Sequence, residues 1–308
     1  MRTFFRNSLI CNEQNSVRIA NRREPVRHNE RRAPLEEHFQ RALNQFFHIG
    51  GDGTLRPVQN QDGRIISINY GKVTALALDP IEKKPLRHFY AGKNILSVGS
   101  FGCNLRCPYC QNHTISMANE VQAVSCYISP EELVACALER IPDGNIGIAY
   151  TYNEPLIGYE YVRDCAMLAK EKQLKNVVVT NGCIAEEAFQ KLLPWIDAWN
   201  IDLKGFKNAS YGQLCGDLEV VKRNIVSAAA QGHVEITTLI VPQRTDTEEE
   251  IRELSSWLSS VDCKIPLHIT RFFPQYRMQD CLATPVSTVY RLADVARKYL
   301  EYVYEGNC

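Results

Sequence analysis

Long apolar runs are absent from this sequence: no stretch approaches the roughly 18 consecutive apolar residues that a membrane-spanning helix needs. An excess of charge is absent too, because 35 Lys and Arg residues balance 35 Asp and Glu residues. A balanced chain has no general affinity for polyanions, which argues against a basic nucleic-acid-binding protein. The first residues also lack the apolar central region of a secretory signal. We therefore expect a globular, cytoplasmic protein with reduced thiols, bound to neither membrane nor nucleic acid.

The 308 residues fit either two domains or one large α/β barrel. The first 48 residues carry nine Arg, no Lys and five Glu, so a net charge of +4 there is balanced by −4 in the rest. Apolar residues at helical spacing over 35–49 predict a helix after about 30 disordered residues. A transit peptide is the alternative, but the Glu residues fit its acid-poor composition badly. We expect a poorly defined basic arm and helix at 1–55, a hairpin segment at 56–93 and a barrel at 94–308.

A regular strand pattern begins at about residue 64. The alternating, β-branched stretch RIISINYGKVTALAL predicts a hairpin that turns at Tyr70-Gly71-Lys72. Six short apolar runs follow, and helical stretches separate them. The six predicted strands cover residues 94–100, 145–151, 176–181, 198–203, 233–241 and 266–272.

The helical stretches carry recognisable start signals. Ser129 stands three residues before Glu132, and Thr247 three residues before Glu250, as in a capping box. Pro155 suits the first turn of another helix. Six strand–helix repeats predict the α/β class, as a partial (β/α)6 TIM-like barrel of parallel strands with an N-terminal β-hairpin and an extra helix. Functional groups in such folds lie at the carboxyl ends of the strands.

Cysteine is plentiful, with 12 residues, and three of them crowd together directly after the first predicted barrel strand. Cys103-x-x-x-Cys107-x-x-Cys110 has one ligand too few for a closed structural zinc site or a four-thiolate cluster. Three thiolates on a four-iron cubane leave one iron open. The alternatives are a zinc knuckle completed by His113, three buried thiols, or a redox dithiol at Cys107 and Cys110. The nine other cysteines are most simply small buried apolar residues.

This motif, on a loop that leaves the first strand of a parallel barrel, resembles that of the radical S-adenosylmethionine (SAM) superfamily. The resemblance implies a [4Fe–4S] cluster held by Cys103, Cys107 and Cys110, whose open iron binds the methionine moiety of SAM. Reductive cleavage of SAM then gives methionine and a 5′-deoxyadenosyl radical that abstracts hydrogen from a substrate. Tyr109 occupies the position that the family packs near the adenine, and ordinary loop packing is its alternative role.

Polar residues at later strand ends complete the predicted cofactor site. Asn153 and Glu154 stand where the superfamily often has a Gly-Gly-Glu segment that binds the cofactor's amino group. A carboxylate there can accept charge-assisted hydrogen bonds from an ammonium. The alternative is that Glu154 is only an acid at a helix N-terminus before Pro155. The third strand ends in Thr180-Asn181, which we include in the predicted site.

The fourth and sixth strands add three further candidates. Lys204 is expected to contact the cofactor carboxylate and Asp202 to position it, with a plain surface ion pair as the alternative. His268 is either a contact to cofactor or substrate or a satisfied core histidine. No catalytic residue is assigned beyond these cofactor and cluster contacts.

Longer segments resemble one branch of the superfamily, the AmmeMemoRadiSam-system radical SAM enzymes, relatives of the pyruvate formate-lyase-activating enzymes. These segments are DPIEKKPLRHFYAGKNILSVGSFGCNLRCPYCQNHTIS, IAYTYNEP, VVVTNG, WNIDLKGF and LHITRFFPQY. The resemblance implies an anaerobic cytoplasm, a flavodoxin- or ferredoxin-type electron donor and a link to Memo-like and AMMECR-like proteins, but no substrate. The family's Cys-x-x-Cys-Pro-His-x-x-Cys head is missing, since only Cys11 lies there. Either an accessory site was lost or the first 50 to 55 residues come from an altered frame or start, and we favour the second.

The sequence leads to three hypotheses about function. The leading one is a radical SAM enzyme that modifies a small molecule or a protein. The second is an activase that installs a glycyl radical on a partner enzyme. The third, outside enzymes, is an iron–sulfur electron carrier or sensor. The sequence leaves the substrate and the oligomeric state open.

Overall fold

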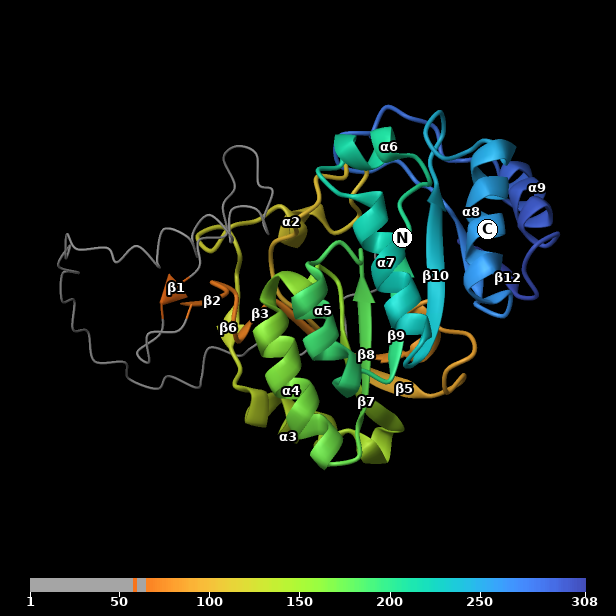
Figure 1. The fold of residues 1–308 in the computed structure, drawn as a ribbon. Coiled ribbons are helices and arrows are strands. Elements are labelled where there is room, and N and C mark those ends of the chain that lie inside the picture. The colour runs from red at the N-terminus through yellow and green to blue at the C-terminus, as the bar shows by residue number, and fades with distance from the viewer. Residues whose placement is uncertain (1–57, 60–64) are drawn as a thin grey trace, which may run out of the picture.

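A computed structural model describes residues 58–59 and 65–308 of the chain. The predicted arm and helix of residues 1–55 lie outside the described residues. The centre of the fold is an eight-stranded sheet in the order β12-β11-β10-β9-β8-β7-β5-β4 (Figure 1). The strands are β1 Val58–Gln59, β2 Ile65–Ile66, β3 Lys72–Val73, β4 Ala75–Pro80, β5 Asn94–Gly99, β6 Cys126–Tyr127, β7 Asn145–Tyr150, β8 Lys175–Thr180, β9 Ala198–Asp202, β10 His233–Ile240, β11 Leu267–Arg271 and β12 Val303–Gly306.

All neighbours in this sheet are parallel except β4 and β5, which pair antiparallel. Helices follow the parallel strands and cover the sheet from outside, while α2 and α6 lie at the end where β8 terminates (Figure 1). The α/β fold and its six predicted strands are confirmed, and β12 is an unpredicted addition. The helices are α2 His113–Ser116, α3 Pro130–Glu139, α4 Tyr159–Glu171, α5 Glu186–Leu192, α6 Asn208–Gln213, α7 Leu218–Ala229, α8 Glu248–Asp262 and α9 Val286–Ala296, with 3₁₀ turns η1 Ile81–Lys83, η2 Ile141–Asp143, η3 Pro155–Gly158 and η4 Leu193–Trp195.

Two of the predicted helix starts show how local sequence sets the boundaries. At α3 the Ser129 side chain accepts from the Glu132 N–H and the Glu132 carboxylate accepts from the Ser129 N–H, a complete capping box. At α8 Thr247 caps the helix, but the Glu250 carboxylate accepts from the Phe206 N–H at 2.7 Å instead. The second box is therefore only half formed, because a tertiary contact claims its glutamate.

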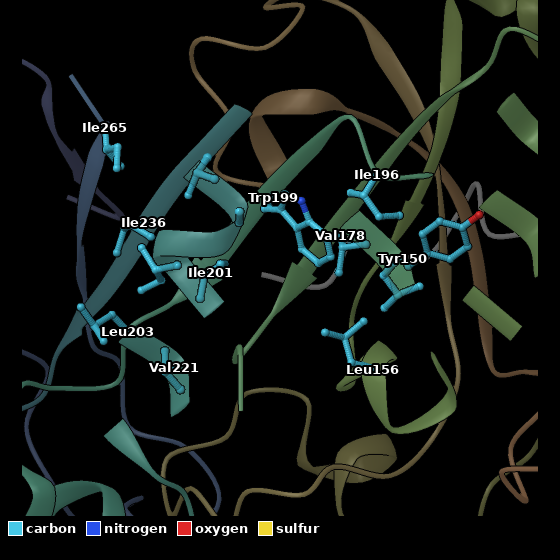
Figure 2. Packing of buried hydrophobic residues seen from close by; sticks show 14 of the residues in the cluster. Tyr150, Leu156, Val178, Ile196, Trp199, Ile201, Leu203, Val221, Ile236 and Ile265 are labelled. Carbon is cyan, nitrogen blue, oxygen red and sulfur yellow. The ribbon is translucent and has the colours of Figure 1, made fainter. Parts of the chain in front are cut away.

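The sheet is buried on both faces. Toward the helices, alternate strand residues such as Val178, Trp199 and Ile236 form the main apolar core (Figure 2). On the opposite face a smaller core joins Ile95, Ala149, Val177 and Ala198 to Ile81, Leu86 and Phe89. Burying each large apolar side chain contributes about 1.5–3 kcal/mol. The segment 81–89 thus packs its apolar side chains against the inner face of the partial barrel.

The predicted hairpin around Tyr70-Gly71-Lys72 is wrong in its pairing, although the turn exists. Gly71 has a φ of +70°, and a Cβ there would lie 2.4 Å from the Tyr127 ring. The strand before the turn, β2, pairs antiparallel with β1, whereas β3 pairs with β6 and β4 with β5. Alternation of apolar and polar residues predicts a strand but not the strand with which it pairs. Here β4 pairs with the barrel strand β5.

The two edges of the main sheet, within residues 65–308, are β4 and β12, so strand pairing leaves the barrel partial. Antiparallel β4 covers the outer edge of β5. Among the described helices, none has the length and apolar character needed to cross a membrane.

Candidate functional site

The three clustered cysteines lie on the loop that follows β5, at the carboxyl end of the parallel strands. Several backbone contacts fix this loop: the Gly102 N–H donates to the Ile115 carbonyl and the Arg106 N–H to the Leu214 carbonyl, both at 2.9 Å. The Arg106 guanidinium also donates to the Cys103 carbonyl at 2.7 Å. The loop is therefore shaped by the protein itself and presents its thiols from a defined backbone.

The surroundings of the thiols suit a buried cluster. Cys107 is 8% exposed and packs with Leu105, Tyr109, Leu214, Val241 and Phe272, while Cys103 and Cys110 lie against the same group. Burial raises the pKa of the Cys107 thiol, which favours the neutral thiol unless a positive charge binds the sulfur.

The described residues around the thiols do not form a site for a single metal ion. In the described part of the chain, no three His, Cys, Asp or Glu side chains are grouped to hold one metal ion, so His113 and the thiols make no preformed zinc knuckle. The ligands of a four-iron cubane bind separate irons and need not converge on one point. The donor set of three thiols in apolar surroundings fits such a cluster.

Glu154, after β7, is the buried carboxylate of the site. It is 4% exposed, and it accepts hydrogen bonds from the Thr180 hydroxyl at 2.6 Å, the Asn181 N–H at 2.7 Å and the Leu156 N–H at 3.1 Å. Burial raises the pKa of Glu154 to about 7 in spite of these donors. The Leu156 contact is the helix-capping role considered from sequence, but burial and the two contacts from β8 go beyond it. A nearby cation would stabilise the charged form of this buried carboxylate.

Asn153 and Asn181 tie the strand ends to the cysteine loop. The Asn153 side chain accepts from the Ser100 N–H at 2.9 Å and donates to the Gly102 carbonyl at 3.1 Å. Asn181 donates to the Asn104 side chain at 2.8 Å and lies 3.8 Å from the Cys103 sulfur. The amides predicted to touch a cofactor are thus also clamps on the loop that carries the first thiol.

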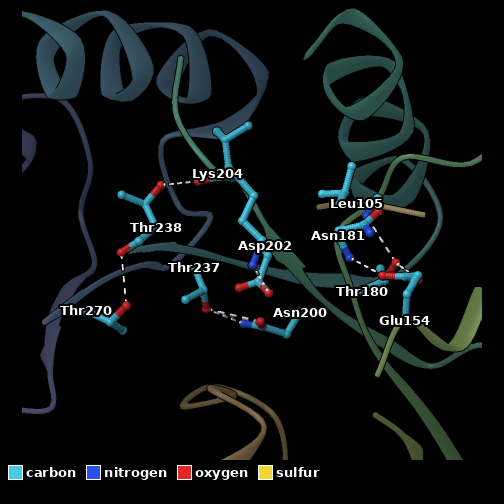
Figure 3. A network of polar contacts seen from close by, with 12 residues as sticks. Leu105, Glu154, Thr180, Asn181, Asn200, Asp202, Lys204, Thr237, Thr238 and Thr270 are labelled. Atoms are coloured by element: carbon cyan, nitrogen blue, oxygen red, sulfur yellow. Dashed lines mark hydrogen bonds and ion pairs between the residues drawn. The ribbon is translucent and has the colours of Figure 1, made fainter. Parts of the chain in front are cut away.

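Asp202 and Lys204 form a second polar pair at the end of β9. The Lys204 ammonium lies 2.7 Å from the Asp202 carboxylate, and their side chains are 19% and 32% exposed. Burial opposes the charge on Lys204, but Asp202 and Cys107 raise its pKa well above the ordinary value. Figure 3 shows this pair on one side of the network and Glu154, with its partners from β8, on the other. The site therefore offers a carboxylate, Glu154, and an ammonium, Lys204, in separate places.

Tyr109 is 5% exposed and packs beside Cys107 in the apolar group around the thiols. The loop after β11 closes over the same region: the Arg277 N–H donates to the Pro108 carbonyl at 2.9 Å. The Tyr276 ring stacks on His113, with centroids 4.7 Å apart. A segment more than 160 residues away in sequence thus packs against the cysteine loop.

His268 lies in a different cluster. Its Nε2 is 2.6 Å from the Glu235 carboxylate, and its ring stacks on Tyr304. Glu235 also accepts from the backbone N–H groups of Arg87 and His88, which belong to the segment under the barrel. The contacts of His268 are those of a satisfied core histidine, the alternative that the sequence left open, and we leave it out of the proposed site.

Two site residues and one backbone conformation escaped the sequence analysis. Asn104 joins the cysteine loop to β8 through its donation to the Cys183 carbonyl at 2.6 Å and its acceptance from Asn181. Asn112 donates to the Tyr152 carbonyl at 2.7 Å, and Tyr152 has an unusual positive φ of 74°. Asn104 stands inside the cysteine motif, which was a usable signal. Nothing local marks Asn112 or the conformation of Tyr152.

The sequence of this chain is similar to those of known proteins. The family model of the radical SAM superfamily matches residues 97–258. An uncharacterized protein of Methanocaldococcus jannaschii is 40% identical over 81% of this chain and 74% of its own length. A pyruvate formate-lyase-activating enzyme of Clostridium pasteurianum is 27% identical over 55% of this chain and 72% of its own length.

The fold has a counterpart among solved structures as well. Streptococcus suis SuiB bound to S-adenosylmethionine aligns over 70% of this chain and 52% of that chain, with a TM-score of 0.56 and 13% identity. At that identity the likeness concerns the fold alone. The family match covers about half of the chain and includes the three-cysteine loop and the ends of β7, β8 and β9. This chain is a member of the radical SAM superfamily and an enzyme.

Proposed function

We propose that this enzyme holds a [4Fe–4S] cluster on Cys103, Cys107 and Cys110 and binds SAM against its open iron. When bound, the reduced cluster supplies the electron that cleaves SAM to methionine and a 5′-deoxyadenosyl radical, which takes a hydrogen atom from the substrate. The observation that carries the proposal is the placing of a buried carboxylate, Glu154, and a cation, Lys204, around a three-thiol loop. The family assignment makes the protein an enzyme, so the electron-carrier alternative is not retained.

The chain's own residues divide the work of binding SAM. Glu154 would accept the ammonium of the methionine moiety, since its charge is costly to bury alone and a cation would relieve that cost. Lys204 would bind the carboxylate, with Asp202 orienting it. Tyr109 would pack along the adenine. Asn181 holds both the Glu154 carboxylate and the cysteine loop in place.

Anaerobic reconstitution tests this proposal directly. The reconstituted protein should carry about four irons and, with SAM and dithionite, should release 5′-deoxyadenosine. Reduced flavodoxin and reduced ferredoxin should each be tried in place of dithionite, because the activating-enzyme relatives favour such a donor. A protein that carries the full cluster, binds SAM and yields no 5′-deoxyadenosine under any of these reductants would refute the proposed chemistry.

A glycyl-radical activase is the second candidate. It is favoured by the likeness to a pyruvate formate-lyase-activating enzyme of Clostridium pasteurianum. In such an activase the 5′-deoxyadenosyl radical would abstract a hydrogen atom from the α-carbon of a glycine in a partner enzyme. Incubation with glycyl-radical enzymes from the same genome should then produce a protein-based doublet in electron paramagnetic resonance, and the absence of the doublet with every such partner would exclude this candidate.

We also propose the AmmeMemoRadiSam branch and a cytoplasmic location, on the strength of the motif segments around residues 79–116 and 148–155. This branch predicts a functional link to Memo-like and AMMECR-like proteins. Adding both proteins from the same genome to the reconstituted enzyme should change the rate or the products of SAM cleavage. Identical rates and products with and without them would speak against the link.

A further inference from the structure

Tyr152 adopts a backbone conformation that tyrosine rarely takes. Its φ is +74°, and it directly precedes Asn153 and Glu154. A side chain with a Cβ is crowded in this left-handed region, so the conformation persists only where the surroundings enforce it. The structure shows contacts to both the side chain and the backbone of this residue.

The Tyr152 side chain is anchored at its far end. Its hydroxyl donates to the Asp79 carboxylate at 2.7 Å, across 73 residues of sequence. The ring lies against Gly99, where a Cβ would come within 2.7 Å of the Tyr152 ring carbon Cδ2. On the backbone side, the Tyr152 carbonyl accepts from Asn112. Gly99 thus leaves the space that the ring occupies, and Asp79 fixes its direction.

Asp79 is held in turn by two lysines. The Lys84 ammonium, on a residue only 2% exposed, lies 3.0 Å from one carboxylate oxygen, and the Lys83 ammonium lies 2.9 Å from the other. Lys84 also lies 4.8 Å from the centre of the Tyr152 ring, a cation–π contact. Burial alone would raise the pKa of Asp79, but Lys84, Lys83 and Tyr152 keep it well below its usual range. The anchor is therefore a charged, hydrogen-bonded group.

The two residues that follow Tyr152 belong to the proposed SAM site, so the backbone conformation of Tyr152 affects where their side chains lie. Asn153 bridges the Ser100 N–H and the Gly102 carbonyl, which lead into Cys103. Glu154 then meets Thr180 and Asn181 from β8. A change in the backbone at Tyr152 would displace both side chains together, since they are the next two residues.

We propose that Tyr152, anchored by Asp79 and Lys84, is a positioning residue that sets the Glu154 carboxylate and the start of the cysteine loop for SAM binding. This inference rests on the proposed function. It links the antiparallel edge strand β4 and the segment after it, which carry no cluster ligand, to the cofactor site on β7. It also gives the buried Lys84 a role.

The test compares Tyr152→Phe and Asp79→Asn with the wild type and with Tyr150→Phe. Tyr150 is a matched control, because it lies two residues earlier on β7 and its buried hydroxyl contacts Asn176, a residue outside the proposed site. Iron content, the dissociation constant for SAM, and kcat and KM for 5′-deoxyadenosine release are measured on the reconstituted enzymes. Electron paramagnetic resonance of the reduced cluster with and without SAM reports whether the cofactor reaches the iron.

Both test variants should keep the iron and raise KM and the dissociation constant for SAM about tenfold, with a smaller change in kcat, because a charge-assisted hydrogen bond is lost. The double variant should be little worse than either single one, since both remove the same contact. Tyr150→Phe should match the wild type. If one test variant does not fold, the other and Lys84→Met decide the question.

Wild-type affinity for SAM in Tyr152→Phe and Asp79→Asn would overturn the positioning role, as would an equal loss in Tyr150→Phe. Failure of the proposed function looks different: then the wild type itself, with a full cluster, would release no 5′-deoxyadenosine. In that case the dissociation constants for SAM and the resonance spectra still compare the variants.

Discussion

The backbone N–H of Asn181 donates a 2.7 Å hydrogen bond to the Glu154 carboxylate, joining the ends of β8 and β7 directly beside the cysteine loop. The side chain of the same residue donates a hydrogen bond to the Asn104 side chain within the cysteine motif. One asparagine therefore couples the buried anion to the loop that carries the thiols. A cofactor whose ammonium binds Glu154 would be placed by the same residues that shape the cluster loop.

Replacing Glu154 by Gln should weaken SAM binding by roughly tenfold to a hundredfold, because a charged hydrogen-bond acceptor becomes a neutral amide. Equilibrium dialysis with SAM under anaerobic conditions measures the change, and iron content should stay near that of the wild type. Glu187→Gln, at an exposed position on α5, is the control and should bind SAM normally. An unchanged dissociation constant in Glu154→Gln would remove Glu154 from the site.

Replacing Cys103, Cys107 or Cys110 singly by Ser should abolish the reconstituted cluster, because in the proposed site each thiolate would hold a different iron. Iron and sulfide analysis and the visible absorption spectrum measure this. Cys183→Ser and Cys281→Ser are stringent controls, since both thiols pack against the same apolar group. Loss of the cluster in a control would show that the ligand set is larger than the motif.

Replacing Lys204 by Met should raise the dissociation constant for SAM about tenfold, by removing the cation that pairs with a carboxylate. Asp202 then loses its partner at 2.7 Å, so the Asp202→Asn/Lys204→Met double variant separates lost binding from an unpaired anion. Lys207→Met, whose side chain is 49% exposed, serves as control. Normal SAM affinity in both Lys204 variants would leave Lys204 as a structural ion pair.

Replacing Glu235 by Gln should lower stability at neutral pH but much less in acid. Burial alone would raise the pKa of Glu235, but hydrogen bonds from His233, His268 and two backbone N–H groups lower it from 4.5 to about 2. Since the folded pKa lies below the unfolded one, the stabilisation is complete above about pH 4.5 and is lost as the pH falls toward 2. It amounts to about 3 kcal/mol at most.

Urea unfolding of the Glu235→Gln variant and the wild type measures this difference. At about pH 3 the difference should be less than half of that at pH 7. Glu171→Gln, at the exposed end of α4, should show no such dependence. A difference that stays constant with pH would mean that Glu235 stabilises the protein by its shape and not by its charge.

Replacing Gly147 by Ala should destabilise the fold by about 3 kcal/mol or prevent folding, because overpacking forces the backbone apart. A Cβ at Gly147 would lie 1.9 Å from the Lys175 carbonyl oxygen, where β7 pairs with β8. Gly212→Ala is the control: nothing lies within 4 Å of its Cβ position on α6, so the variant should be neutral or slightly stabilising. Thermal unfolding of both variants decides, and equal melting temperatures would contradict the steric argument.

The sequence by itself determined the strand and helix alternation and the three-thiol motif, because both are local. Periodicity and capping residues act over a few positions, so the six strands and the Ser129 cap were predictable. The spacing of Cys103, Cys107 and Cys110 predicted membership of the radical SAM superfamily, and the family match over residues 97–258 confirms that membership. The same local evidence could not choose a partner for β4 or show that the Glu250 side chain bonds to Phe206.

Only the tertiary structure decided which polar residues share the site. His268 and Lys204 both follow from strand ends in the sequence, yet His268 bonds to Glu235 and Lys204 pairs with Asp202. Tyr152 needed Asp79, 73 residues earlier, before its role could be inferred. Such contacts depend on strand register and on burial, which bring distant residues together and which no short stretch of sequence encodes.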